Sequence, residues 1–286
     1  MPREMTTRES RNFYEDVAHK RRPMRSHMDT STYYMKHWKR EWRLIAEDIG
    51  ANGHFLILDV GCGPALLLRE LDRSHGHEYL GMDIAKNALP TAKNEGKAGF
   101  MLGNAEAFPI ADGVIDVVVA SHLIEHLHNA HLFLSECHRV LKPHGRLIVA
   151  TPNDDSPLKR PLLLKSAFAA GTALAFCTSL ANPRGFYTKV LDFANARRDG
   201  MQAVHTHSQE EHVHEFGPEE LRHELESIGF KMKKIRFSGI HVFRYSLVLD
   251  DSFGSAWFAV SSRLENAQSR NLAAWAYDMT FITEKD

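Results

Sequence analysis

The sequence predicts an α/β fold whose seven-stranded, doubly wound sheet is mostly parallel, with an antiparallel last strand. Three observations predict it. Short apolar runs alternate with segments of helical periodicity, one of these runs ends in a glycine-rich turn, and 43% hydrophobic and 25% charged residues make up an ordinary globular composition. Such alternation is typical of parallel strands joined by right-handed helical crossovers.

The alternation begins with a helix expected over 30–49, where aromatic and aliphatic residues recur at intervals of three and four. The charged, weakly patterned residues before it include Pro23, which ends any helix there, so we expect an arm that packs late. The continuous apolar run 55–60 suits a strand buried on both faces. The further strands are expected at 79–83, 100–102, 115–120, 146–150, 231–237 and 277–282, the last closing the sheet edge, and the further helices at 65–71, 88–93, 130–140, 217–229 and 252–268.

An interruption of this alternation after the fifth strand divides the chain into four parts. We expect an N-terminal arm and helical cover over 1–50, an α/β core over 51–153, an insertion over 154–216 and a completion of the core sheet over 217–286. Long irregular insertions of this kind tend to be lids. The apolar segment 161–180 fits a helix that lines an apolar pocket, rests peripherally on a membrane or packs in the core, and these alternatives stay open.

Charge and cysteine content exclude several classes of protein. The 35 basic and 36 acidic residues leave a formal charge of -1, so no overall basic field attracts nucleic acid. Cys62, Cys137 and Cys177 are widely spaced and odd in number, which argues against a disulfide framework and fits a reducing compartment. The N-terminus has no uninterrupted apolar stretch of the kind found in signal peptides. We therefore expect a cytoplasmic protein.

The turn after the first strand predicts a nucleoside site. The segment 58–65 contains the end of a strand, a glycine turn and the start of a helix. Asp83 ends the next strand, and its separation from Gly61 along the sequence is about that at which an acidic residue binds ribose hydroxyls in dinucleotide folds. Leu66 stands where a dinucleotide site needs its third glycine, and the G-K-[ST] string of a phosphate-binding loop is absent near Gly63. These features favour an adenosine ligand without a diphosphate.

Four strings in order, LDVGCGPA, GMDIA, GNAEAFPIADGVIDVVVASHLIEHL and ECHRVLKPHGRLIVATPN, resemble the class I S-adenosylmethionine-dependent methyltransferases of the small-molecule, type 11-like kind. The resemblance covers about 55–153, and it implies a Rossmann-like fold and S-adenosylmethionine as cofactor. The chain departs from the family pattern at Asn104, where an acid is usual, and at His144, where glycine is common. The cofactor-binding residues that the resemblance implies are Asp59, Gly61, Cys62 and Gly63 at the methionine part, Asp83 at the ribose, Ile84, Asn104, Ala105 and Glu106 at the adenine, and Ser121 and His122 beneath the sulfonium.

Methyl transfer from a sulfonium is an in-line displacement with a neutral leaving group, so the main task of the enzyme is to align the reactants. A base matters only where the acceptor is a hydroxyl, an ammonium or a carbon acid. His122, Glu125 and His126, at the end of the fourth strand, are the candidate catalytic residues. The alternative is that Glu125 and His126 only cap and pack the following helix.

We predict no metal site. The segment 122–126 reads H-x-x-E-H, an inverted zinc-protease string, but it begins at a strand end rather than within a helix. Two H-x-H pairs later in the chain would face one way on extended backbone and could bind a metal, but solvated or substrate-facing histidines are the favoured explanation. These pairs are His205 with His207 and His212 with His214.

The acceptor that this sequence favours is a small or lipid-like molecule. Methylation of the exocyclic amine of bases is disfavoured, because Ser121-His122-Leu123 follows the fourth strand in place of an Asn/Asp-Pro-Pro-aromatic string. Two alternatives are kept: a non-catalytic S-adenosylmethionine-binding regulatory module, and a nucleic-acid or protein methyltransferase. The methylated atom and the oligomeric state stay open.

Overall fold

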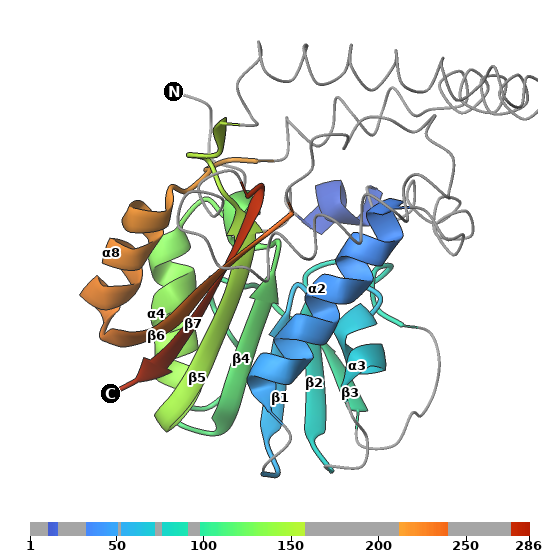
Figure 1. Cartoon of the computed structure of the whole chain (residues 1–286). Helices are drawn as coiled ribbons and strands as arrows, with labels where there is room; N and C mark the ends of the chain where they lie inside the picture. The colour runs from blue at the N-terminus through green and yellow to red at the C-terminus, as the bar shows by residue number, and fades with distance from the viewer. Residues whose placement is uncertain are drawn as a thin grey trace, which may run out of the picture.

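Seven strands form one sheet in the order β3-β2-β1-β4-β5-β7-β6, with helices on both faces in the computed structural model of Figure 1. The structure describes residues 11–16, 33–50, 53–71, 76–90, 98–157, 212–239 and 276–286. The expected helices over 161–180 and 252–268 lie outside these residues. The strands are β1 (Leu56–Val60), β2 (Glu78–Asp83), β3 (Ala98–Leu102), β4 (Ile115–Ser121), β5 (Leu141–Pro152), β6 (Phe230–Ser238) and β7 (Asp278–Lys285).

The strand directions confirm the predicted fold class. Strands β1 to β5 pair in parallel, and β7 runs antiparallel to both of its neighbours, β5 and β6. The expectation that the last strand closes the sheet edge is wrong, because β7 lies between β5 and β6 and β6 is the edge. The physical reason is burial: β7 is buried over 278–283, whereas β6 carries exposed lysines, which are typical of an edge strand.

Alternate residues of the central strands pack on different helices, which makes three layers. Ile57 and Val117 pack with helices α2 (Tyr33–Ile49) and α3 (Leu66–Glu70) on one face of the sheet. Leu58 and Val118 pack on the other face with α4 (Ala130–Val140) and α8 (Pro218–Ile228). Both faces of β1 and β4 are therefore covered, as the continuous apolar runs predict.

Helix α2 is the expected N-terminal cover, and it ends at Ile49 as predicted. Ile45 and Ile49 are fully buried against the sheet. Its C-terminal end is held by Arg146 of β5, which donates hydrogen bonds to the carbonyl oxygens of Asp48 and Ile49 at 2.8 and 2.7 Å. A cation at these carbonyls satisfies acceptors that no intrahelical donor reaches.

Three local features differ from expectation. Residues 11–16 of the N-terminal arm form a short helix, and Tyr14 packs against Ala85 and Ala88. Residues 86–88 form a turn where a helix beginning at 88 was expected. The fifth strand, expected from 146, already begins at Leu141 and contains a bulge, because Leu141 pairs with Ile115 while Arg146 pairs with Val117.

The insertion over 154–216 leaves and rejoins the sheet at one point. Asn153 and Phe216 form an isolated parallel bridge, and the Asp154 amide donates to the Phe216 carbonyl oxygen at 3.0 Å. The four-part division of the chain stays a prediction. Within the described ranges, no helix combines the length and apolar character needed to cross a membrane.

We expect Arg146→Lys to lower the free energy of unfolding by about 1–2 kcal/mol, because an ammonium cannot reproduce the paired hydrogen bonds of the guanidinium fork. Urea unfolding at neutral pH measures this. Arg69→Lys, at an exposed position of α3, is the matched control and should stay within about 0.5 kcal/mol of the parent chain. Equal effects of the two substitutions would show that Arg146 does not fasten α2.

Candidate functional site

A cavity of about 530 Å³ opens at the carboxyl ends of β1, β2 and β4 and is called here the central cavity. Ligand sites of α/β sheets form at this edge, where strand order reverses on either side of β1. All eleven predicted cofactor-binding residues line it, together with His126; Glu125 does not. The eleven are Asp59, Gly61, Cys62, Gly63, Asp83, Ile84, Asn104, Ala105, Glu106, Ser121 and His122.

The glycine loop after β1 forms one side of the central cavity. The amides of Gly61 and Cys62 both donate to the Met82 carbonyl oxygen, at 2.8 and 3.1 Å, which ties the loop to β2. Gly63 has a φ of 48°, in the left-handed region, and a Cβ there would meet nothing within 4 Å. The missing side chain therefore leaves the space beside the loop open for a ligand.

Asp83 joins the loop to the end of β2. Its Oδ2 accepts a hydrogen bond from the Gly63 amide at 2.9 Å, and its Oδ1 accepts one from the Ala85 amide at 2.8 Å. The carboxylate is half-buried and lines the cavity. Gly63, expected at the methionine part of the cofactor, and Asp83, expected at the ribose, are thus in direct contact with each other.

Asp59 is a buried carboxyl group at the base of the cavity. The Tyr79 hydroxyl donates to its Oδ2 at 2.5 Å. Burial raises the pKa of Asp59 to about 7, the nearby charge of Asp83 adds to the rise, and the Tyr79 hydrogen bond opposes it. Burial also raises the pKa of the Cys62 thiol. Cys62 is therefore a neutral wall residue, whereas Asp59 has a strong preference for a cationic neighbour.

The turn after β3 bounds the opposite side of the cavity. The Asn104 side-chain oxygen accepts a hydrogen bond from the Glu106 amide at 3.0 Å, and Glu106 Oε1 accepts one from the Asn129 amide at 2.9 Å. The Asn104 side-chain oxygen, which the resemblance implies would accept a hydrogen bond from the adenine amine, thus already accepts one from the Glu106 amide. One lone pair of a carbonyl oxygen remains for a second donor.

His122 follows β4 with a left-handed φ of 52° and lies between two carboxylates. Its Nε2 is 3.4 Å from Glu41 Oε1 and its Nδ1 is 3.3 Å from Glu125 Oε1, and both acids are 1% exposed. Burial alone would lower the pKa of His122, but Glu41 and Glu125 outweigh it and the pKa lies well above its usual value. The raised pKa favours the imidazolium form of His122, which has no lone pair to accept a proton.

Glu125 and His126 lie on the short 3-10 helix η2 (Ile124–His126) and face different surroundings. Glu125 Oε2 accepts a hydrogen bond from the Thr151 hydroxyl at 3.1 Å, in the protein interior. His126 lines the central cavity, with the Tyr14 ring centroid 6.2 Å and the His212 ring centroid 5.0 Å from its own. Among the three candidate catalytic residues, Glu125 does not line the cavity and His122 lies between two acids, so His126 is the best placed to meet a ligand.

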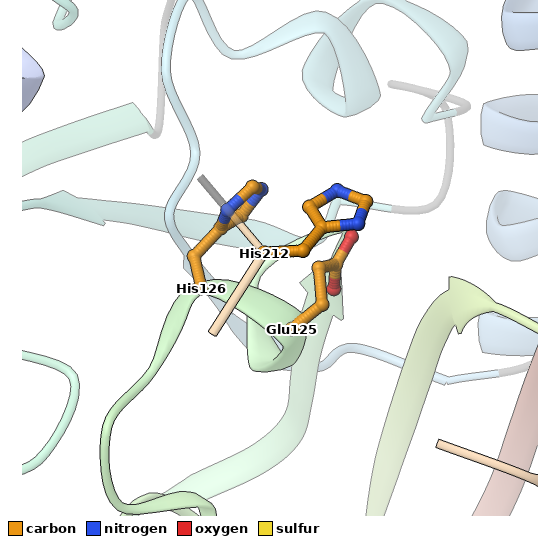
Figure 2. Close-up of side chains that lie close together, drawn as sticks. All are labelled: Glu125, His126 and His212. Carbon is orange, nitrogen blue, oxygen red and sulfur yellow. The ribbon is translucent and has the colours of Figure 1, made fainter. Parts of the chain in front are cut away.

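The predicted H-x-H pair of His212 and His214 does not act as a pair. The Nδ1 of His212 lies 2.8 Å from Glu215 Oε1, whereas His214 Nε2 lies 3.0 Å from Glu220 Oε1. Only His212 turns toward η2, where it approaches Glu125 and His126 (Figure 2). His205 and His207 lie outside the described residues.

Glu41 and Tyr14 are site residues that the sequence reasoning missed. Tyr14 gives no sequence signal, because it belongs to a short helix in a charged arm. Glu41 does give one: it stands four residues before Ile45 and eight before Ile49, on the buried stripe of α2, and it is 1% exposed. An acid within an apolar stripe indicates a buried partner.

Comparison with known sequences finds a family model that matches part of the chain. The family model described as "Methyltransferase domain" matches residues 58–149. The ubiquinone biosynthesis O-methyltransferase of Cereibacter sphaeroides is 34% identical over 102 residues, which are 34% of this chain and 41% of that relative. The chain therefore spans less than half the length of the relative that it matches.

Solved structures share the fold over much more of the chain. The S-adenosylmethionine-dependent methyltransferase of Mesorhizobium loti aligns with a TM-score of 0.52 at 12% identity, over 84% of this chain and 96% of that one. The [4+2]-cyclase SpnF aligns with a TM-score of 0.55 at 15% identity, over 88% and 82%. At these identities the likeness shows the fold alone.

Over residues 58–149 the chain matches a methyltransferase-domain model, so the predicted resemblance to the class I S-adenosylmethionine-dependent methyltransferases is confirmed. S-adenosylmethionine is the cofactor of that class.

We expect Asp59→Asn to stabilise the protein relative to the parent chain increasingly as pH rises from 5 to 7.5. The pKa of Asp59 is about 7 in the folded chain against an ordinary value of 3.8, so the folded state binds the extra proton and loses stability as pH rises toward 7. Asparagine does not ionise. The difference in unfolding free energy between the two chains should therefore grow by a few kcal/mol at most, on the order of 1.4 per unit of pKa shift.

Urea unfolding at pH 5 and pH 7.5 measures this difference. Glu78→Gln, an exposed position at the other end of β2, is the control and should show no such growth. A difference that is equal at both pH values would contradict a raised Asp59 pKa.

Proposed function

We propose that this chain transfers the methyl group of S-adenosylmethionine to a small or lipid-like acceptor by direct in-line displacement. The observation that carries the proposal is one cavity that brings together a glycine loop, the carboxyl groups of Asp59 and Asp83, and the Ser121 and His122 wall at the end of β4. Residues at these positions come from three strands and a loop that the family match covers.

The residues present fit this cofactor in their chemistry. Asp59 is buried and favours a cation, and the methionine part of the cofactor carries an ammonium and a sulfonium. Ser121 Oγ is buried and has no hydrogen-bond partner within the described ranges, so it leaves a polar atom at the cavity wall for a ligand. Ile84 and Ala105 give apolar walls for a purine.

When bound, the cofactor supplies an electrophilic methyl carbon on a neutral leaving group. The chain needs no strong acid and acts by holding, orienting and excluding water. We propose that Asp83 accepts hydrogen bonds from the ribose hydroxyls, because its carboxylate is already fixed by the amides of Gly63 and Ala85. The loop and the acid then position one ligand as a unit.

The acceptor side of the cavity is the side of His126. We propose that the reacting atom of the acceptor meets the chain there and that the proton of an acceptor hydroxyl leaves on this side. His122 is excluded from this role by its two carboxylate neighbours, and we propose instead that it positions η2. A hydroxyl acceptor agrees with the relative from Cereibacter sphaeroides, which is named an O-methyltransferase.

The insertion over 154–216 is proposed to cover the acceptor, because its ends meet through the bridge between Asn153 and Phe216 at the carboxyl end of β5, the strand next to β4. The segment 161–180, outside the described residues, is the part proposed to line an apolar pocket or touch a membrane surface. A cytoplasmic location is proposed as well, and the free thiols of Cys62 and Cys137 support it.

A second candidate function is a non-catalytic S-adenosylmethionine-binding module or another reaction on the same fold. The similarity to the [4+2]-cyclase SpnF supports this second candidate, because the name of that protein states a reaction other than methyl transfer although its fold is similar. Product formation separates the two candidates, whereas cofactor binding does not.

We expect Asp83→Asn to lower the affinity for S-adenosylhomocysteine at least tenfold, about 1.4 kcal/mol, because a neutral amide is a weaker acceptor for ribose hydroxyls. Asn keeps one of the two acceptors for the Gly63 and Ala85 amides, so it disturbs the loop less than Ala would. Isothermal titration calorimetry measures the affinity, with Glu78→Gln on the same strand as control. Unchanged affinity would refute the ribose assignment.

We expect His126→Gln to reduce methyl transfer at least a hundredfold and to change S-adenosylhomocysteine affinity by less than about threefold. The assay follows label from methyl-labelled S-adenosylmethionine into a panel of phenolic, quinol and long-chain hydroxyl acceptors. His223→Gln, at an exposed position of α8, is the matched control. A chain that binds the cofactor and labels no acceptor would favour the non-catalytic module.

A further inference from the structure

Two histidines and one glutamate converge around His126, the member of this cluster that lines the central cavity. One ligand atom from each of Glu125, His126 and His212 lies within 4.8 Å of the other two. Figure 2 shows the three side chains close together, with Glu125 and His126 on η2 and His212 on the segment opposite. We propose that they bind a divalent transition-metal ion of the zinc type, a site that the sequence reasoning did not predict.

The backbone holds the two halves of this cluster in place. The carbonyl oxygen of Glu125 accepts hydrogen bonds from the amides of Val213, at 2.8 Å, and His214, at 3.2 Å. His212 is the residue before this pair of contacts, so its backbone is fixed against η2. The ligand atoms of a tetrahedral zinc site are roughly 3.3 Å apart, and side-chain rotations close the remaining distance.

The surroundings of His212 match those of a metal-binding imidazole. Glu215 Oε1 lies 2.8 Å from its Nδ1, so a proton on that nitrogen is held by the carboxylate and Nε2 is the nitrogen that a metal ion would use. A carboxylate behind a histidine is the usual second partner of zinc ligands. His214, two residues further on, has its Nε2 at Glu220 and takes no part in the cluster.

Glu125 brings a negative charge that calls for a cation. Its Oε1 is buried and, apart from the ion pair with His122, accepts no hydrogen bond from the described part of the chain. Glu41 lies on the opposite nitrogen of His122 and balances the charge of that imidazole. Two imidazoles and one carboxylate favour zinc and similar ions over magnesium, which prefers oxygen ligands.

Three protein ligands leave a fourth position open, and this is the pattern of catalytic zinc sites. The inference rests here on the proposed methyl transfer. An acceptor hydroxyl that binds the ion loses its proton to solvent more readily. Its oxygen then forms a bond to the methyl carbon while the carbon–sulfur bond breaks, and that electron pair stays on sulfur as a neutral thioether. The ion takes no part in electron transfer.

The test uses the full chain without a histidine tag, stripped of metal with a chelator and titrated with Co²⁺ in the absence of cofactor. We expect one equivalent to give the visible absorption of a four-coordinate cobalt site and Zn²⁺ to displace it. His212 is half-buried, and the substitution His212→Gln should weaken cobalt affinity at least tenfold. His214→Gln is the matched control and should leave it unchanged.

Two results would overturn the site: no such spectrum in the parent chain, or equal cobalt affinity in the parent and His212→Gln chains. His126→Gln is a second variant that should also weaken cobalt binding, so that a folding defect in the His212→Gln chain alone does not decide the outcome. Cobalt binding that depends on His212, in a chain that methylates no acceptor, would refute the proposed function and leave the metal site standing. Methyl transfer that is unaffected by chelator would refute the role given to the ion.

Discussion

The buried arrangement of Glu41, His122 and Glu125 is the interaction on which the acceptor side of this protein depends. Each residue comes from a different element: Glu41 from α2, His122 from the end of β4, and Glu125 from η2. Both acids are 1% exposed, and an unpaired carboxylate at such a position costs several kcal/mol. The three elements are therefore stable together only when His122 lies between the two acids, which fixes α2 over the central cavity.

The same glutamate couples this arrangement to the chain that returns from the insertion. Through its side chain Glu125 meets His122 and the Thr151 hydroxyl of β5, and through its carbonyl oxygen it meets the amides of Val213 and His214. Displacing η2 thus disturbs the cover helix, the sheet and the end of the insertion at once. The hydrogen bonds of the glycine loop, by contrast, go to the end of β2.

The sequence predicts the lining of the proposed cofactor side because the signals lie in short strings. A continuous apolar run indicates a buried strand, glycine allows the left-handed φ at position 63, and an acid marks the end of the next strand. The position of β7 and the pairing of Glu41 with His122 depend on partners distant in sequence, which periodicity does not identify. The approach of His212 to His126 depends in the same way on where an irregular segment returns to the sheet.

The contacts around the central cavity fall into two groups, one inside and one outside the residues that the family model matches. The proposed cofactor side is closed by contacts between the glycine loop and the next strand, such as the Gly61 amide on Met82 and the Gly63 amide on Asp83, all within the matched residues 58–149. The acceptor side also takes Tyr14, α2 and His212 from outside that range. Under the proposed function, replacing those outer segments changes what lies opposite the methyl donor and leaves the contacts of the glycine loop in place. Acceptor specificity is then a property of residues that the family match does not reach.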